Sequence, residues 1–422
     1  MSAKNLEIER LRAVAVLLVM LVHSPFKQLL PIYLYSSFTG VDLFFVISGF
    51  VVAGSFLRCL PAQVEPTWVD RLRSNKHRIV AFYLRRIFRI LPLALTYAML
   101  YLVASMLLKA SGSISELARP GDVFREVVAI ASGFYNYALV SGAVTANLAH
   151  YWSLSVEEHF YFITPFLLVV CANTRQRVAT LIVAILLVLL VFRPLTSGPI
   201  VDLSHARFDS LFYGVLLSIL LRYYKSLGVW DFKSLNRAVS TSGVARFMLS
   251  DRARPVLKTT VGLVFCAILA LLPGVTNTAI VGGSGSFYMA SAALIAYSFV
   301  SVILVMLASL ERGWILDIPV WRRVFEYIGS RSYAIYLSHL LLIQLYNDLY
   351  FRFYEMVPPF LKLTQTGYVL QSAVYVVAVV VVSEISYRLI EAPFINMGHA
   401  VTGEPRSTGS TTPVSVQGQA SL

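Results

Sequence analysis

Residues 12–23 read Arg-Ala-Val-Ala-Val-Leu-Leu-Val-Met-Leu-Val-His, so ten consecutive apolar residues lie between two basic ones. With its flanks, this run forms an apolar segment over residues 11–30 that is long enough to cross about 30 Å of hydrocarbon as an α-helix. The 422-residue chain is 57% hydrophobic and only 14% charged, whereas soluble domains are about one-quarter charged. The composition therefore excludes an ordinary soluble enzyme and a disordered chain, and it predicts a polytopic membrane protein.

Ten segments of the chain have the length and apolarity of membrane-spanning helices. An eleventh candidate, residues 122–140, contains charged residues and is interrupted by Gly133. The sequence therefore predicts an all-α polytopic transmembrane bundle of about ten spans. The predicted spans are 11–30, 40–57, 87–108, 153–171, 178–194, 207–222, 256–273, 287–309, 326–346 and 367–388.

The positions of Lys and Arg predict the orientation, because cytoplasmic loops are enriched in basic residues. With ten spans and both termini cytoplasmic, 27 of the 35 basic residues lie inside and 8 lie outside. If residues 122–140 also crossed, 16 of those 27 would move outside. We therefore place residues 109–152 in an outer loop with a short amphipathic or re-entrant helix. The net charge of +13 then marks cytoplasmic loops and no nucleic-acid partner.

The predicted membrane domain covers residues 1–397, and residues 398–422 form a predicted disordered tail. This tail is rich in Gly, Ser and Thr and has no apolar period. Cys59, Cys171 and Cys266 are far apart and have no metal-ligand spacing, so we expect free thiols and no metal site. The polar N-terminus has no small-residue cleavage site, and we expect the first span to be retained.

Arg12 and His23 are candidate functional residues because ionisable side chains inside a span are costly. Eleven residues at about 100° each complete about three turns, so both side chains lie on one helix face, about 16 Å apart. In the predicted orientation, Arg12 lies at the cytoplasmic edge and His23 lies in the outer half. The alternative interpretation of His23 is an interhelical hydrogen bond.

Further polar residues lie in the outer halves of their predicted spans. Asp42 is close enough in topology to orient His23, but it could equally cap the start of its helix. Glu157 shares a helix face with Tyr161, although a first-turn acid also complements the helix dipole. The clustering predicts a polar centre that opens toward the outer side. Its predicted members are His23, Asp42, Glu157, Asp209 and His339.

A basic group lies on the cytoplasmic side of the third predicted span. Arg85, Arg86 and Arg89 occupy about one-third of a helix circumference. Such a group fits a phosphorylated ligand, because guanidinium groups bind phosphate oxygens in pairs. The alternative is an anchor to anionic lipid headgroups.

These motifs resemble the integral-membrane acyltransferase 3 family, bacterial O-acyltransferases that modify cell-surface sugars. The resemblance extends from Glu9 to about Phe394 and depends on six markers in this order. They are the Arg12…His23 pair, GVDLFFVISGF at 40–50, YLRRIFRILP at 83–92, WSLSVEEHFYFITP at 152–165, SYAIYLSHLL at 332–341 and SYRLIEAPF at 386–394.

The resemblance implies a domain of the bacterial inner membrane that moves an acyl group, usually acetyl, from cytoplasmic acyl-CoA to a glycan or lipid-linked saccharide outside. It implies that His23 is essential, with Arg12 as its partner and Glu157 as the acid of the WSLxVE motif. It also implies that residues 85–89 engage CoA as a co-substrate, with no permanently bound cofactor. Many members carry an esterase-like domain after the spans, and this tail is too short for one. We therefore expect the acceptor to bind in the membrane domain.

The residues and the resemblance together predict an O-acetyltransferase in which His23 is a general base or a transient acyl carrier. Asp42 or Glu157 would orient His23. We expect the acceptor to contact Trp152, Ser155, Tyr161 and His339. The alternative is a transporter or flippase for a lipid-linked saccharide with a His/Glu proton relay, which the absence of an inverted repeat argues against.

Overall fold

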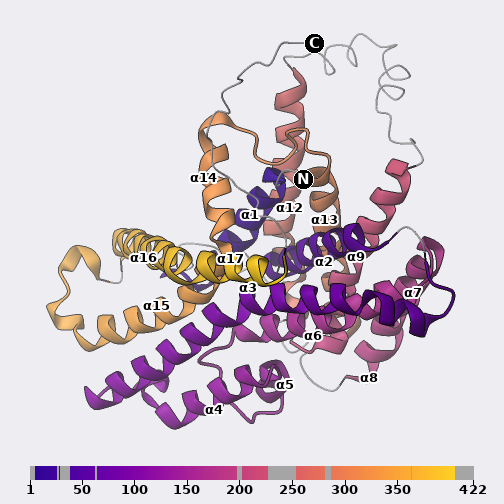
Figure 1. The fold of residues 1–422 in the computed structure, drawn as a ribbon. Helices are drawn as coiled ribbons and strands as arrows, with labels where there is room; N and C mark the ends of the chain where they lie inside the picture. Colours follow the sequence, from indigo (N-terminus) through magenta and orange to yellow (C-terminus); the bar gives the residue numbers. More distant parts are fainter. Residues whose placement is uncertain are drawn as a thin grey trace, which may run out of the picture.

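The computed structural model describes residues 5–25, 28, 39–61, 64–196, 202–226, 253–280, 287–362 and 364–403. Every regular element within these residues is a helix and none is a strand, which confirms the all-α prediction (Figure 1). The longer helices are α1 Leu6–His23, α2 Thr39–Cys59, α3 Trp68–Ala110, α4 Pro120–Ala131, α6 Tyr151–Val170, α7 Thr174–Leu187, α9 Ser204–Ser226, α12 Ala253–Ile280, α13 Phe287–Ser309, α14 Pro319–Ser330, α15 Ser332–Arg352, α16 Gln365–Ser386 and α17 Ala392–Val401.

Short helical elements join the longer ones. Among the described residues they are η3 Glu116–Ala118, α5 Tyr135–Val140, η4 Val188–Phe192, α8 Arg193–Leu195, η5 Tyr354–Met356, η6 Pro359–Leu361 and η7 Tyr387–Glu391. η4 and η7 are π-helical and continue α7 and α16 without a break. α7 with η4, and α16 with η7, therefore each form one continuous helical stretch.

Six helical stretches in the described part are long and apolar enough to cross a membrane, which supports a membrane protein. α1 differs from them because Glu7, Glu9, Arg10 and Arg12 charge its first half. The total of ten spans and the cytoplasmic location of both termini remain predictions. The six stretches are Thr39–Cys59, Trp68–Ala110, Thr174–Leu195, Pro255–Pro273, Ser291–Ser309 and Gln365–Val401.

Two predicted spans do not form single helices. α1 ends at His23, where the Ser24 backbone N–H donates to the Met20 carbonyl, so the helix does not extend to residue 30. Pro25 follows directly and favours an extended residue before it. The predicted span 326–346 is divided at Arg331, whose backbone leaves the helical region between α14 and α15. Hydropathy alone does not register either break.

Residues 122–140 do not form a span. They fold into α4 and α5, which are separated by a turn at Gly133 with a φ of 78°. This positive φ favours glycine and stops the helix. α4 packs on α3 and α5 packs on α6, so the prediction that this segment contains short helices is confirmed.

Close backbone contact between α2 and α9 positions the centre of the molecule. A Cβ at Gly49 would lie 2.0 Å from the Leu211 carbonyl oxygen, and one at Gly214 would lie 2.2 Å from the Val46 oxygen. Only glycine allows this approach, as is common where membrane helices pack tightly. α9 is thus the partner of α2 at Gly49.

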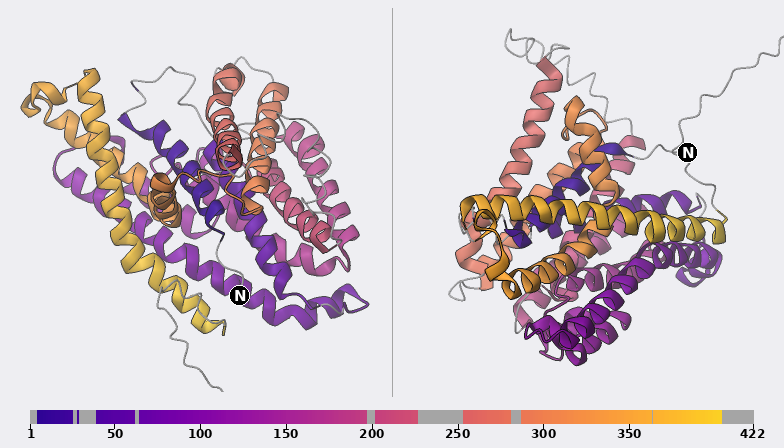
Figure 2. Two further views of the ribbon diagram at one scale, coloured as in Figure 1. Left: turned by 90° about the horizontal axis from the view of Figure 1, so that it is seen from above. Right: turned by 90° about the vertical axis from the view of Figure 1, so that its left-hand side faces the viewer.

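α3 is a 43-residue helix that carries the basic group of residues 85–89 in its middle. Residues 68–86, predicted as part of a cytoplasmic segment, therefore continue the span as one helix. α17 crosses and packs on α3, with Gly398 against the Phe88 ring (Figure 2). Gly398 to Val401 belong to α17 and not to the predicted tail, while residues 404–422 lie outside the described part.

Candidate functional site

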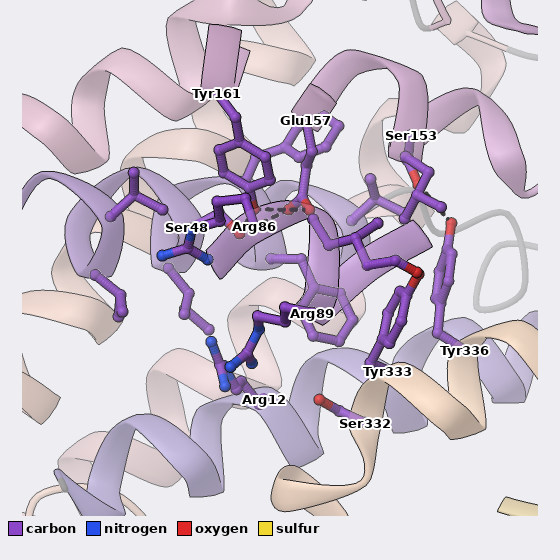
Figure 3. Close-up of a pocket in the computed structure, with 18 residues that line it drawn as sticks. Arg12, Ser48, Arg86, Arg89, Ser153, Glu157, Tyr161, Ser332, Tyr333 and Tyr336 are labelled. Carbon is purple, nitrogen blue, oxygen red and sulfur yellow. Dashed lines mark hydrogen bonds between the residues drawn. The ribbon is translucent and has the colours of Figure 1, made fainter. Parts of the chain in front are cut away.

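A cavity of about 90 Å³ lies among α1, α2, α3, α6 and α15 (Figure 3). We call it the central cavity. One part of its lining is apolar and comes mainly from α2, and the other is polar. The polar lining consists of Arg12, Ser48, Arg86, Arg89, Ser153, Glu157, Tyr161, Ser332, Tyr333 and Tyr336.

The Glu157 carboxylate is fixed by two hydroxyl groups. Ser48 Oγ donates to Glu157 Oε1 at 2.6 Å, and Tyr161 OH donates to Oε2 at 3.0 Å (Figure 3). Glu157 and Tyr161 share a face of α6, as their spacing predicted, and α2 supplies Ser48. A carboxylate removed from bulk water needs such donors because unpaired buried charge is very costly. The bonds hold the carboxylate at one place in the cavity wall.

Three arginines converge on one side of the central cavity (Figure 3). Arg12 comes from α1, and Arg86 and Arg89 come from α3. The Arg86 guanidinium lies over the Tyr161 ring, 5.1 Å from its centroid, and Arg12 Nη1 lies 3.3 Å from Glu9 Oε1. The cavity thus has more guanidinium groups than carboxylates and favours an anionic ligand. Arg85, predicted with Arg86 and Arg89, does not line it.

Three histidines gather beside the central cavity. The His339 ring centroid lies 5.2 Å from that of His23 and 5.4 Å from that of His150. We call these residues the histidine cluster. Their arrangement is not that of a metal site, and no group of metal-ligating side chains occurs elsewhere among the described residues.

Hydrogen bonds assign the tautomers of two cluster members. His23 Nδ1 lies 3.0 Å from the Val19 carbonyl oxygen, and His339 Nδ1 lies 2.6 Å from the Tyr336 carbonyl oxygen. A carbonyl oxygen only accepts, so each Nδ1 carries the hydrogen and each neutral Nε2 is basic. His23 therefore presents a nitrogen that can accept a proton or attack a carbonyl carbon.

Tyr336 connects the central cavity to the histidine cluster. It lines the cavity, and its ring centroid lies 5.6 Å from that of His339 and 5.7 Å from that of His150. Its hydroxyl donates to the His150 carbonyl at 2.9 Å and lies 2.7 Å from Ser153 Oγ. Tyr336 and then His339 thus connect the arginine-lined space to His23.

Asp42 and Asp209 belong to a different buried group. Arg207 Nη2 binds Asp42 Oδ1 at 2.7 Å, and Arg193 Nη2 binds Asp209 Oδ1 at 2.8 Å, with all four side chains fully buried. Asp42 lies inside α2, three residues after its first residue, and is therefore not an N-cap. These ion pairs join α2, α8 and α9. No local pattern predicted the pairing, because partners far apart in the chain have no spacing to recognise.

The other predicted acceptor contacts are divided between sites. Tyr161 lines the central cavity and His339 belongs to the histidine cluster. Trp152 and Ser155 are buried but do not line the cavity, and the Trp152 ring packs edge-on against Phe45. Their role in binding the acceptor remains a prediction.

Sequence reasoning did not single out His150, Ser153, Tyr336 or Ser48 as site residues. Ser48, Ser153 and Tyr336 lie within the quoted motifs, and His150 lies two residues before one of them. Their position in or beside a motif was therefore the available signal. Hydroxyl-bearing residues in apolar helices are common, and only the fold shows which ones face a cavity.

A buried carboxylate holds the segment that leads to His150. Glu126 of α4 accepts hydrogen bonds from Tyr135 OH at 2.9 Å, Asn147 Nδ2 at 3.0 Å and the Leu148 backbone N–H at 2.8 Å. Its side chain is fully buried, and the donors come from both sides of residues 136–146. Glu126 therefore fixes the chain immediately before the histidine cluster.

Comparison with known families agrees with this geometry. The family model described as "Acyltransferase domain" matches residues 5–388, which is nearly the whole described chain. The chain belongs to the acyltransferase 3 family. Its members supply relatives whose names state an activity, and no solved structure matches this chain.

Two relatives illustrate how similar this chain is to proteins named O-acetyltransferases. A Staphylococcus aureus (strain COL) protein, whose name marks O-acetyltransferase activity as inferred, is 25% identical over 93% of this chain and 57% of its own length. The peptidoglycan O-acetyltransferase OatA of Listeria monocytogenes is 26% identical over 93% of this chain and 56% of its own length. The chain thus spans little more than half the length of these relatives.

Proposed function

We propose that this chain is an O-acetyltransferase that transfers an acyl group from acyl-CoA to a hydroxyl of a glycan or lipid-linked saccharide. One observation carries the proposal: ring contacts through Tyr336 and His339 connect an arginine-lined cavity to His23, whose Nδ1 lies 3.0 Å from the Val19 carbonyl oxygen. The first part suits a phosphorylated donor, and the second suits proton or acyl transfer. Family membership supports the reaction class, and the names of the relatives support a glycan acceptor.

The donor would bind through its phosphates to the three arginines of the central cavity. Guanidinium groups form paired, charge-assisted hydrogen bonds with phosphate oxygens. Arg86 is oriented by the Tyr161 ring, and Tyr161 is held by Glu157. Glu157 therefore acts on the donor by positioning Arg86. CoA leaves after each turnover, so it is a co-substrate and not a permanent cofactor.

His23 would perform the transfer through Nε2. In one route, Nε2 takes the proton of the acceptor hydroxyl while the hydroxyl oxygen bonds to the thioester carbonyl carbon. The C–S bond then breaks, and the CoA sulfur receives the proton from the imidazolium. In the other route, Nε2 attacks the thioester carbonyl carbon, and the C–S bond breaks to leave the CoA thiolate. The acceptor hydroxyl oxygen then attacks the acyl-imidazolium, the C–N bond breaks to free His23, and the hydroxyl proton passes to the thiolate. Both routes yield the same O-acyl ester and free CoA.

The predicted topology gives this reaction a direction. Arg12 lies near the predicted cytoplasmic end of α1 and His23 is its last residue. A donor that enters from the cytoplasm would meet the arginines first and reach His23 from the inner side. The acceptor would approach from the outer face of the bacterial inner membrane. The lipids of that membrane, and no nucleic acid, complete the expected set of partners.

The test is transfer of radiolabelled acetyl from acetyl-CoA in membranes that contain the full-length chain. We expect label in the glycan or lipid-linked saccharide fraction, released by mild base as acetate because the product is an ester. Label on a protein histidine after brief exposure would select the covalent route. Saccharide movement across the membrane without acetyl incorporation would contradict the proposal and favour a flippase.

A further inference from the structure

α14 has an apolar face that the described residues leave largely exposed. Val320, Trp321, Val324 and Tyr327 are 76%, 54%, 44% and 38% exposed. Val320, Val324 and Tyr327 recur at helical spacing and fall within about 60° of one another. Figure 1 shows α14 at the edge of the helix bundle, beside α1.

The opposite face of α14 is fixed to α1. Arg10 Nη2 lies 2.9 Å from Glu326 Oε1, with the arginine side chain only 6% exposed. A Cβ at Gly329 would lie 1.8 Å from the Glu9 carbonyl oxygen, so the two backbones touch there. α14 is therefore held in one orientation, and its apolar face points away from the fold.

The length and charge of α14 indicate what covers this face. Twelve residues span about 18 Å as a helix, which is too short to cross the hydrocarbon layer. Arg322 and Arg323 are exposed on the same helix, and Arg322 makes only a 3.5 Å surface contact with Asp317. A short helix with an apolar face, a tryptophan and arginines is typical of a helix that lies in the membrane interface.

We propose that α14 is an interfacial helix that inserts Val320, Trp321 and Val324 among the lipids of the predicted cytoplasmic leaflet. Arg323 flanks this face and would bind anionic headgroups. Residues that line the central cavity, Ser332 and Tyr333, follow α14 directly. Docking at the membrane surface would therefore hold the start of α15 and, through Glu9, the end of α1 that carries Arg12. The proposal does not depend on the reaction proposed above.

Nitroxide depth measurements test this proposal directly. Spin labels at Val324→Cys and at Arg322→Cys would be compared in nanodiscs, after Cys59, Cys171 and Cys266 are replaced by serine. The two positions are two residues apart and lie about 200° apart around the helix. We expect the label at 324 to be more accessible to oxygen than to a nickel chelate, and the label at 322 to show the reverse. High nickel accessibility at both positions would overturn the proposal and indicate water or an absent protein partner.

A second measurement uses the protein with its native cysteines in place, and it tests whether α14 recognises the charge of the lipid headgroups. Lipids brominated near the headgroup should quench Trp321, and the quenched component should disappear in Trp321→Phe. An equal quenched fraction in both proteins would also overturn the proposal. Arg323→Glu should weaken the quenching in nanodiscs that contain phosphatidylglycerol and leave it unchanged in phosphatidylcholine. The same response in both lipids would rule out recognition of anionic headgroups.

Discussion

Both oxygens of the Glu157 carboxylate accept a hydroxyl hydrogen, and this determines how the residue can be tested. Glu157→Gln keeps the size of the side chain, but the amide nitrogen cannot accept the bond from Ser48 or Tyr161. An unsatisfied buried partner costs about 1–3 kcal/mol, or about 5- to 150-fold in rate if the loss falls on the transition state. We expect initial rates of acetyl transfer to fall within that range.

The matched control for this change is Glu116→Gln, because Glu116 is exposed between α3 and α4. It should leave the rate unchanged. Wild-type activity of Glu157→Gln would show that the carboxylate has no part in positioning Arg86.

Arg86 tests the donor side of the cavity. Arg86→Lys keeps the positive charge but loses the planar fork that binds a phosphate with two hydrogen bonds and stacks on Tyr161. We expect KM for acetyl-CoA to rise about tenfold, while KM for the acceptor changes little. Arg73→Lys, on an exposed position of the same helix, should change neither constant. An equal rise in KM for the acceptor would assign Arg86 to the other substrate.

At this scale the sequence predicted which residues are candidates better than it predicted their contacts. Spacing and motif identified Arg12, His23, Arg86 and Glu157, because those residue types are rare inside apolar helices. The sequence did not show that Asp42 is paired with Arg207 and not with His23, because no local pattern predicts a contact between residues 165 positions apart. Ser48 and Tyr336 were missed for the same reason.

Among the elements, the contact of α2 with α9 allows a prediction about stability. Gly49→Ala places a Cβ 2.0 Å from the Leu211 carbonyl oxygen, so the helices must separate. Overpacking of this kind costs about 1–3 kcal/mol. We expect a lower unfolding temperature in detergent, followed by tryptophan fluorescence. Gly121→Ala is the matched control, since a Cβ there meets nothing within 4 Å. Equal unfolding temperatures would show that α2 and α9 are less tightly packed.

The buried ion pair between the same two helices gives a second stability prediction. Arg207→Ala leaves the Asp42 carboxylate buried without its cation, which costs about 3–5 kcal/mol. Arg125→Ala removes a surface ion pair whose arginine side chain is 63% exposed, and this should cost about 0–1 kcal/mol. The free energy of unfolding of each variant would be measured in detergent with increasing concentrations of a denaturant. A similar loss for both variants would contradict the structural role of the Asp42–Arg207 pair.

The element boundaries show where the sequence was insufficient. Apolar length identified the helical segments, but it joined α14 to α15 and extended α1 past His23. In both places the backbone turns within a run that hydropathy reads as continuous. The consequence is functional, because ending α1 at His23 places this histidine at a helix terminus and not inside a span.

In the whole molecule, the central cavity and the histidine cluster lie one after the other, with Tyr336 at their junction. Arg12 lies in the first half of α1 and His23 is its last residue, and Tyr336 lies between the cavity and the cluster. This order fits transfer from a donor on one face to an acceptor on the other.

His23 performs the transfer in the proposed mechanism, and one paired measurement tests this role. Acetyl incorporation from labelled acetyl-CoA into the saccharide fraction would be compared for His23→Ala and His77→Ala at equal protein level and equal unfolding temperature. His77 is an exposed histidine on α3, so its replacement controls for loss of any imidazole. We predict that His23→Ala abolishes incorporation and that His77→Ala leaves it unchanged. Incorporation by folded His23→Ala at the wild-type rate would contradict the mechanism.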